Sequence, residues 1–150
     1  MQPIQTGETS SSSWEHNVFA ICPRRTLVLA PSREVGTSAE HCAEKFLRKN
    51  GLKLIERNFS ASGGEIDLIM LDGATLVFVE VRFRKHEHFG RAEETVDFRK
   101  QQRIIHTAKR YLQTHPNAQQ SPCRFDVVTF TTEVTSSKLE WIKNAFLVEE

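Results

Sequence analysis

The clearest pattern in the chain is a pair of apolar runs, residues 64–71 and 74–84, which Asp72-Gly73 separates. Within the runs, acidic positions alternate with Ile, Leu, Val or Phe, as side chains do on the two faces of a β-strand. Asp-Gly suits the positive φ angles of a two-residue type I′ turn. The pattern therefore predicts an antiparallel hairpin with Asp72 and Gly73 as its loop.

The register of this hairpin decides where its acids lie. With that loop, Asp67 falls opposite Phe78 and Glu65 opposite Glu80. Because opposed side chains point to the same side, one face carries three acids and one base. These residues are Glu65, Asp67, Glu80 and Arg82. The other face, which includes Ile66 and Leu68, is apolar. Crowded carboxylates repel each other unless a divalent cation or the Arg82 guanidinium lies among them.

Asp67 and Glu80 fit the requirements of Mg²⁺, which one or two carboxylates commonly bind together with waters and a substrate phosphate. Mn²⁺ is the alternative ion. An ordinary charged strand face is the competing interpretation. In that case each acid is solvated or paired with Arg82, Arg84 or Arg57.

Further elements flank the hairpin on both sides. Apolar residues recur at helical spacing over 37–50 and 93–113. Strand patterns occupy 52–59, 124–131 and 138–148, although the last also suits a short helix. This order predicts an α/β domain with a mixed sheet and flanking helices.

The start of the first helix offers two roles for Glu40. Thr37 as N-cap and Glu40 three residues later match a capping box. If this helix end faces the strand acids, Glu40 could also orient a metal ion or a water. Gly63-Gly64 predicts a tight turn, or a close approach of the backbone to a phosphate.

The second helix carries the best nucleic-acid signal. Arg99, Arg103, His106 and Arg110 gather on one exposed face of it. Residues 82–110 contain nine Lys or Arg and four Asp or Glu. This excess of positive charge favours contact with a phosphate backbone, and a merely solvated helix face is the alternative.

Three sequence motifs carry a resemblance to a known family. GEIDLI at 64–69, VFVEVR at 77–82 and RFDVV at 124–128 resemble the YraN family of uncharacterised bacterial proteins. That family is related in fold to the PD-(D/E)XK nucleases and to Holliday-junction resolvases. The resemblance covers residues 36–131 and implies a restriction-endonuclease-like three-layer core with a mixed sheet of four to five strands.

The resemblance also implies roles for individual residues. Asp67 and Glu80 match the paired metal-binding acids, and Glu40 matches the glutamate of the first helix. Arg82 stands where the nucleases carry a lysine that positions or deprotonates the attacking water. Arginine keeps its proton and is a poor base, although Arg82 could contact the scissile phosphate.

Catalysis would then need either a metal-bound hydroxide as the nucleophile or a lysine supplied from elsewhere in the chain. Lys100 lies at the edge of the apolar stripe of the second helix, and Gln101 projects into that stripe. If this helix start lies above the hairpin, Lys100 could replace the missing lysine and Gln101 could contact the acids.

Length and composition bear on the number of domains, the binding partners and the cellular location. A chain of 150 residues with 39% apolar and 26% charged residues is suited to one domain. We assign this domain to residues 36–150 and regard residues 1–35, which lack periodicity, as a largely disordered extension. The net charge of +1 says little about which partners the protein binds. Three dispersed cysteines and the absence of an apolar run of about 18 residues predict a cytoplasmic protein.

The sequence therefore predicts a Mg²⁺-dependent, structure-selective endonuclease that cleaves branched or damaged DNA. Asp67 and Glu80 would bind the metal, Glu65 and Glu40 would orient the ion or water, and Arg82 would contact phosphate. Residues expected to contact DNA are Arg84, Arg99, Arg103 and Arg110. A homodimer is possible. The alternative function is a catalytically weak or inactive binding or adaptor module on the same scaffold, and a purely structural domain is the third.

Overall fold

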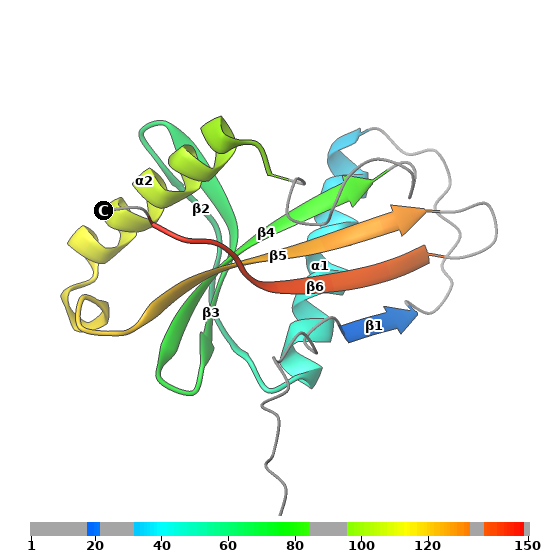
Figure 1. Cartoon of the computed structure of the whole chain (residues 1–150), viewed down its shortest axis with the longest axis horizontal. Helices are drawn as coiled ribbons and strands as arrows, with labels where there is room; N and C mark the ends of the chain where they lie inside the picture. Colours follow the sequence, from blue (N-terminus) through cyan, green and yellow to red (C-terminus); the bar gives the residue numbers. More distant parts are fainter. Residues whose placement is uncertain (1–17, 22–31, 85–95, 133–136, 149–150) are drawn as a thin grey trace, which may run out of the picture.

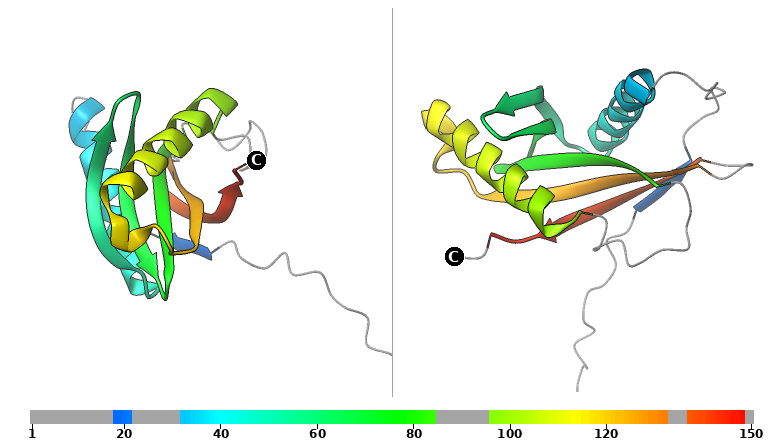
Figure 2. Two further views of the ribbon diagram at one scale, coloured as in Figure 1. Left: turned by 90° about the vertical axis from the view of Figure 1, so that its left-hand side faces the viewer. Right: turned by 90° about the horizontal axis from the view of Figure 1, so that it is seen from above.

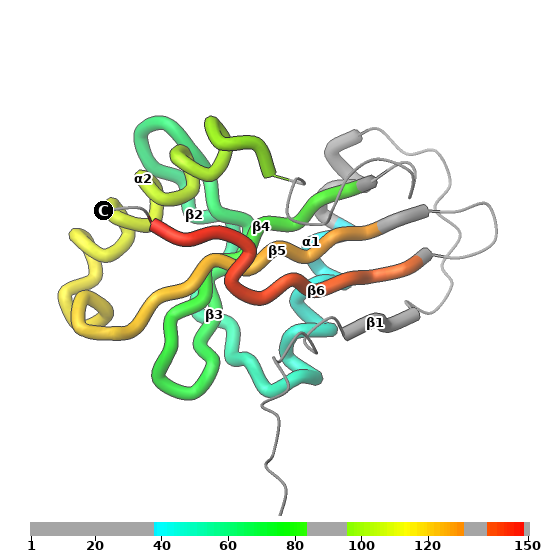
Figure 3. Tube along the Cα trace, viewed as in Figure 1, coloured from blue at the N-terminus to red at the C-terminus, as the bar shows by residue number. Residues whose placement is uncertain are grey.

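In the computed structural model, the apolar patterns become two α-helices, a short 3-10 helix and six strands within the described residues, which are 18–21, 32–84, 96–132 and 137–148 (Figure 1). Figure 3 follows the path of the Cα atoms in the same view. The elements are β1 (Val18–Ile21), α1 (Ser32–Lys49), β2 (Lys53–Ala61), β3 (Gly64–Asp72), β4 (Thr75–Arg84), α2 (Phe98–Thr114), η2 (Pro116–Ala118), β5 (Cys123–Thr132) and β6 (Ser137–Phe146).

The strands form one mixed sheet in the order β1-β6-β5-β4-β3-β2. The β4–β5 pair is parallel and the other pairs are antiparallel. Helix α1 covers one face and α2, which connects β4 to β5, covers the other (Figures 1 and 2). This confirms the predicted three-layer α/β core. None of the helices in the described part of the chain is long and apolar enough to cross a membrane.

The N-terminal boundary differs from the prediction. Strand β1, inside the segment assigned to an extension, pairs with β6 and gives the sheet a sixth strand. Helix α1 begins at Ser32, so Thr37 is not its N-cap and Glu40 closes no capping box. The predicted stop at Asn50-Gly51 is confirmed. Gly51 has a φ of 95°, and the Leu52 N–H donates to Leu47 O at 3.1 Å, as in a Schellman motif.

The hairpin forms, but its predicted register is wrong. Asp72 pairs with Thr75, so the loop is Gly73-Ala74. Of these two, Gly73 alone has a positive φ, at 60°, as in a type II′ turn rather than type I′. Each strand is displaced by one position relative to the prediction. Because this changes the sum of paired positions by two, the register error by itself moves no side chain to the other face of the sheet.

Helix α2 is shorter than predicted. It begins at Phe98, where the side chain of Asp97 accepts a hydrogen bond from Lys100 N at 2.9 Å as the N-cap. It ends at Thr114, before His115-Pro116, as expected. Residues 85–95, including part of the predicted helix, lie outside the described residues. The segment at 138–148, for which strand and helix were both open, is mostly strand β6.

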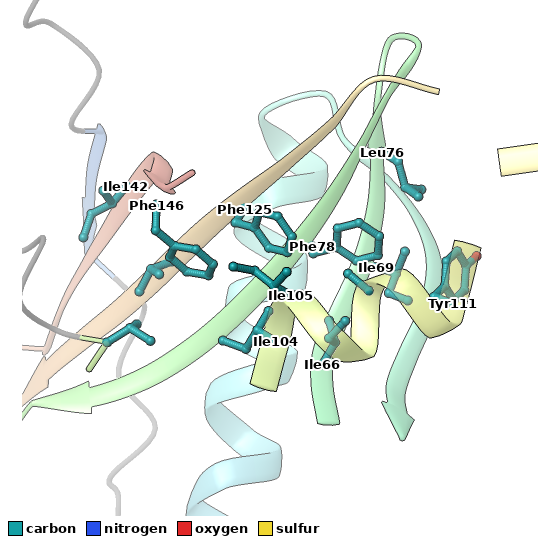
Figure 4. Close-up of a cluster of buried hydrophobic side chains, with 13 residues drawn as sticks. Ile66, Ile69, Leu76, Phe78, Ile104, Ile105, Tyr111, Phe125, Ile142 and Phe146 are labelled. Atoms are coloured by element: carbon teal, nitrogen blue, oxygen red, sulfur yellow. The ribbon is translucent and has the colours of Figure 1, made fainter. Parts of the chain in front are cut away.

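Two apolar clusters fill the spaces between the sheet and its helices. Strand β3 contributes to both, and the predicted alternation of its side chains fails before Leu68. Ile66 packs in the cluster beneath α2 with Ile104 and Phe78, whereas Leu68 packs beneath α1 (Figure 4). The sequence pattern put Ile66 and Leu68 on one face. The change of face coincides with the point where β3 separates from β4.

Candidate active site

Strands β3 and β4 separate at the residue that carries the first predicted metal ligand. Their last paired residues are Leu68 and Val79, and beyond them the two strands diverge (Figure 1). At this fork Asp67 Oδ2 accepts a hydrogen bond of 2.7 Å from Val81 N. The carboxylate thus takes the place of a backbone acceptor in the ladder, and this bond fixes the Asp67 side chain against β4.

Glu80 lies on β4 at the same fork and is buried. Lys100 Nζ, from the first turn of α2, lies 3.0 Å from Glu80 Oε1, and an Arg82 guanidinium nitrogen lies 3.7 Å from the same oxygen. The other oxygen, Oε2, is buried and has no hydrogen-bond partner among the described residues. A buried carboxylate oxygen without a partner is costly, because it has lost the water that solvated it.

Electrostatics confirm that the two acids are close and poorly solvated. The pKa of Asp67 is raised from 3.8 to about 7, first by burial and then by the charges of Glu80 and Glu40, against the opposing effect of the Val81 hydrogen bond. Burial also raises the pKa of Glu80, although Lys100 and Arg82 act in the opposite direction. Loss of solvation is therefore the main cost of placing the two carboxylates at this site.

This donor set fits a hard divalent cation. Asp67 and Glu80 supply carboxylate oxygens, which Mg²⁺ and Mn²⁺ prefer, and the Oε2 oxygen of Glu80 lacks a partner within the described residues. No group of three or more His, Cys, Asp or Glu in the described parts of the chain is placed to hold a metal. A cation at Asp67 and Glu80 would therefore depend on water or substrate for its remaining ligands.

The other predicted catalytic residues lie at different distances from this pair. Glu65 is exposed on β3, and its charge raises the pKa of Glu80. Glu40, half-buried on α1, adds to the rise in the pKa of Asp67. The amide nitrogen of Gln101 donates to Val96 O at 2.8 Å at the start of α2, and within the described residues Gln101 makes no hydrogen bond to the acids.

The predicted basic face of α2 is exposed. Arg99, Arg103 and Arg110 all point to solvent, whereas the side chain of Arg84 lies outside the described part of the structure. Gly64 lets β3 approach this helix closely. A Cβ at Gly64 would lie 2.6 Å from Thr107 Oγ1. Of the two interpretations of Gly63-Gly64, Gly63 provides the turn with a φ of 101°, and Gly64 packs against α2.

Comparison with known proteins identifies the family to which this chain belongs. Residues 39–130 match the uncharacterised protein family UPF0102. The chain belongs to UPF0102. A UPF0102 protein of Stutzerimonas stutzeri is 50% identical over 118 residues, which are 79% of this chain and 98% of that protein. A UPF0102 protein of Pseudomonas aeruginosa is 48% identical over 117 residues, which are 77% of this chain and 94% of that protein.

Among solved structures, that of Pyrococcus furiosus SfsA in complex with Ca²⁺ covers 78% of this UPF0102 chain and 65% of its own. It has 14% sequence identity and a TM-score of 0.39, a similarity too low to carry an argument. The expectation of a family of uncharacterised bacterial proteins is confirmed. Placement of this UPF0102 member in the PD-(D/E)XK superfamily stays a prediction.

The structure also decides which charges in this UPF0102 chain serve the fold. Arg57, a candidate partner for the strand acids, instead binds Glu44 of α1 through two hydrogen bonds of 2.7 and 2.8 Å. Sequence reasoning missed Glu44, although its place between Ala43 and Leu47 on the apolar stripe was a signal. Asp126 is fully buried and accepts hydrogen bonds from three groups. The donors are Arg124 Nε, Trp141 Nε1 and Asn144 N.

Proposed function

We propose that this UPF0102 protein is a divalent-metal-dependent endonuclease that acts on DNA, with Mg²⁺ or Mn²⁺ bound by Asp67 and Glu80. One observation carries the proposal. Two carboxylates with raised pKa values share the fork between β3 and β4, and one buried oxygen of Glu80 has no partner among the described residues. A fold that keeps such an arrangement without a ligand gains nothing in stability from it.

The residues around the acids suit a phosphodiester substrate. When bound, the ion would supply Lewis-acid chemistry at the phosphate. Asp67 and Glu80 would hold it, and the hydrogen bond from Val81 N keeps Asp67 oriented for this task. Arg82, on β4 two residues after Glu80, would place its guanidinium on a non-bridging phosphate oxygen.

The exposed arginines of α2 would bind the neighbouring backbone. From Arg99 to Arg110 the helix rises roughly 16 Å, which corresponds to about five base-pair steps of DNA. Contacts to phosphates orient a duplex but read no sequence. A structure-selective enzyme that acts on branched or damaged DNA is consistent with this arrangement. The resemblance of the strand motifs to a family related in fold to resolvases supports it.

A second function has one observation in its favour. Position 82 holds an arginine, which does not give up a proton under ordinary conditions, so the strand itself offers no lysine to the attacking water. A DNA-binding or adaptor module that keeps the scaffold with little or no hydrolysis would have the same basic face. Metal binding and turnover distinguish the two functions.

Isothermal titration of Mg²⁺ and Mn²⁺ tests the metal centre, with Asp67→Asn and Glu80→Gln as the diagnostic variants. Asp72→Asn is the matched control, since it removes an acid from the opposite end of the same strand, where it pairs with Arg124 at 2.8 Å. We expect wild type and control to bind the ion and both diagnostic variants to lose it. Equal binding by all four proteins would refute the site.

Cleavage assays then decide between the enzyme and the binding module. Labelled four-way junctions, flapped duplexes and plain duplexes are incubated with Mg²⁺ or Mn²⁺ and with EDTA. Metal-dependent cleavage that Asp67→Asn abolishes would establish the nuclease. Metal and DNA binding without products from any substrate would establish the binding module.

A further inference from the structure

Two cationic side chains from different elements lie close to the same oxygen of Glu80. Lys100 comes from the first turn of α2 and Arg82 from β4, and both approach Oε1. They do so at different ranges: Lys100 Nζ lies at hydrogen-bond distance, 3.0 Å, whereas the Arg82 nitrogen at 3.7 Å is too far for a hydrogen bond. Lys100 is therefore the cation that the fold attaches to Glu80.

The Lys100 ammonium is suited to a second contact. It has three N–H donors, and Glu80 takes one of them. Its side chain is 29% exposed, so the charge lies at the border between the buried acids and solvent. Lys100 also follows Arg99 directly and lies one helical turn before Arg103, so DNA held by those arginines would pass next to it.

We propose that Lys100 is the catalytic lysine of this centre, supplied by α2 instead of by strand position 82, and that its ammonium contacts the scissile phosphate. This inference rests on the proposed nuclease function. It gives each cation a separate partner: Lys100 serves the reacting phosphate next to Glu80, and Arg82 binds another oxygen of the substrate. It also makes α2 a single unit that both binds the backbone and completes the acid pair.

Moving the lysine back to the strand tests the proposal. Lys100→Met keeps the aliphatic stem and removes the charge, and we expect cleavage to fall by about 100-fold or more. Adding Arg82→Lys to that variant should recover at least about tenfold of the lost rate if one lysine at the acid pair is what the centre requires. Lys109→Met, an exposed lysine of the same helix, is the control and should cleave like wild type.

Metal affinity gives a readout that does not depend on turnover. Lys100→Met removes a positive charge beside Glu80, so titration calorimetry should show Mg²⁺ binding that is tighter than in wild type, by about tenfold. A lysine that only supported the fold would lower the stability of the protein when removed and leave the cleavage rate of the folded variant unchanged. Weaker binding, full cleavage by Lys100→Met, or a double variant no faster than Lys100→Met would each overturn the inference.

The same experiments distinguish a failure of the proposed nuclease function from a failure of the Lys100 assignment. A wild-type protein that cleaves no DNA would end the nuclease proposal, whatever the variants do. Wild-type cleavage that survives Lys100→Met would end only the assignment of the lysine.

Discussion

Replacing Asp67 by asparagine should stabilise the metal-free protein at neutral pH. The Asp67 carboxylate is held at a poorly solvated site near another acid, and its pKa is raised from 3.8 to about 7. Asparagine has nearly the same shape, and its side-chain oxygen can still accept the hydrogen bond from Val81 N. The substitution therefore removes the charge while keeping the contact that orients the side chain.

The magnitude follows from the pKa of Asp67. A shift of one pKa unit corresponds to about 1.4 kcal/mol, so the change from 3.8 to about 7 corresponds to about 4 kcal/mol of destabilisation once the group is ionised. Burying the new amide offsets part of this gain. We expect an increase of about 2 kcal/mol in the free energy of unfolding, or about 4–8 °C in Tm for a protein of this size.

The pH dependence has a definite sign. Between pH 4 and pH 7 the folded protein retains the Asp67 proton that the unfolded chain has already released. The unfolded state then binds fewer protons, so stability decreases as pH rises through this range and levels off above about 7. Asp67→Asn should lose most of this decrease, and its advantage over wild type should disappear near pH 4.

Urea unfolding followed by circular dichroism at several pH values from 4 to 9, in EDTA, measures this difference. Glu65→Gln is the matched control, because it neutralises an exposed acid of the same strand and should change stability by less than about 0.5 kcal/mol. An Asp67→Asn protein that is less stable than wild type at pH 8 would show that the carboxylate stabilises the fold. The charge-crowding argument for a metal site would then fail.

Three further predictions concern the surroundings of the site. Gly64→Ala should cost about 1–3 kcal/mol in urea unfolding, because the new methyl group would force α2 away from β3; an unchanged midpoint would show that the helix adapts freely. Arg99→Ala and Arg103→Ala should each weaken DNA binding at low salt and reduce the slope of log K against log salt by about one, as fluorescence anisotropy would measure. Glu44→Gln should destabilise the protein by about 1–3 kcal/mol, since it breaks the buried end of a bidentate pair with Arg57; Arg57→Gln is the paired variant that reports whether the two effects are coupled.

The sequence by itself determined most of the elements, β1 excepted, and the faces of most residues. Period-two alternation identified the hairpin, and helical spacing identified both helices, because these periods are local consequences of backbone geometry. The side on which Asp67 and Glu80 lie survived an error in the turn, since a two-position change in register leaves every strand face unchanged. The proposal that Lys100 lies next to Glu80 was also within reach of the sequence.

Only the tertiary structure decided how the two acids meet. Sequence alternation assumes a continuous ladder, but β3 pairs with β4 only from Leu68 onward. In the unpaired part of β3 before Leu68, Ile66 turns toward α2 and the Asp67 carboxylate accepts a hydrogen bond from Val81 N. Desolvation of Glu80, the distance from Lys100 to its oxygen, and the choice of Glu44 as the partner of Arg57 depend on how α1 and α2 pack over the sheet. Contacts between residues far apart in the chain leave no period in the sequence, and for this reason they had to be read from the folded protein.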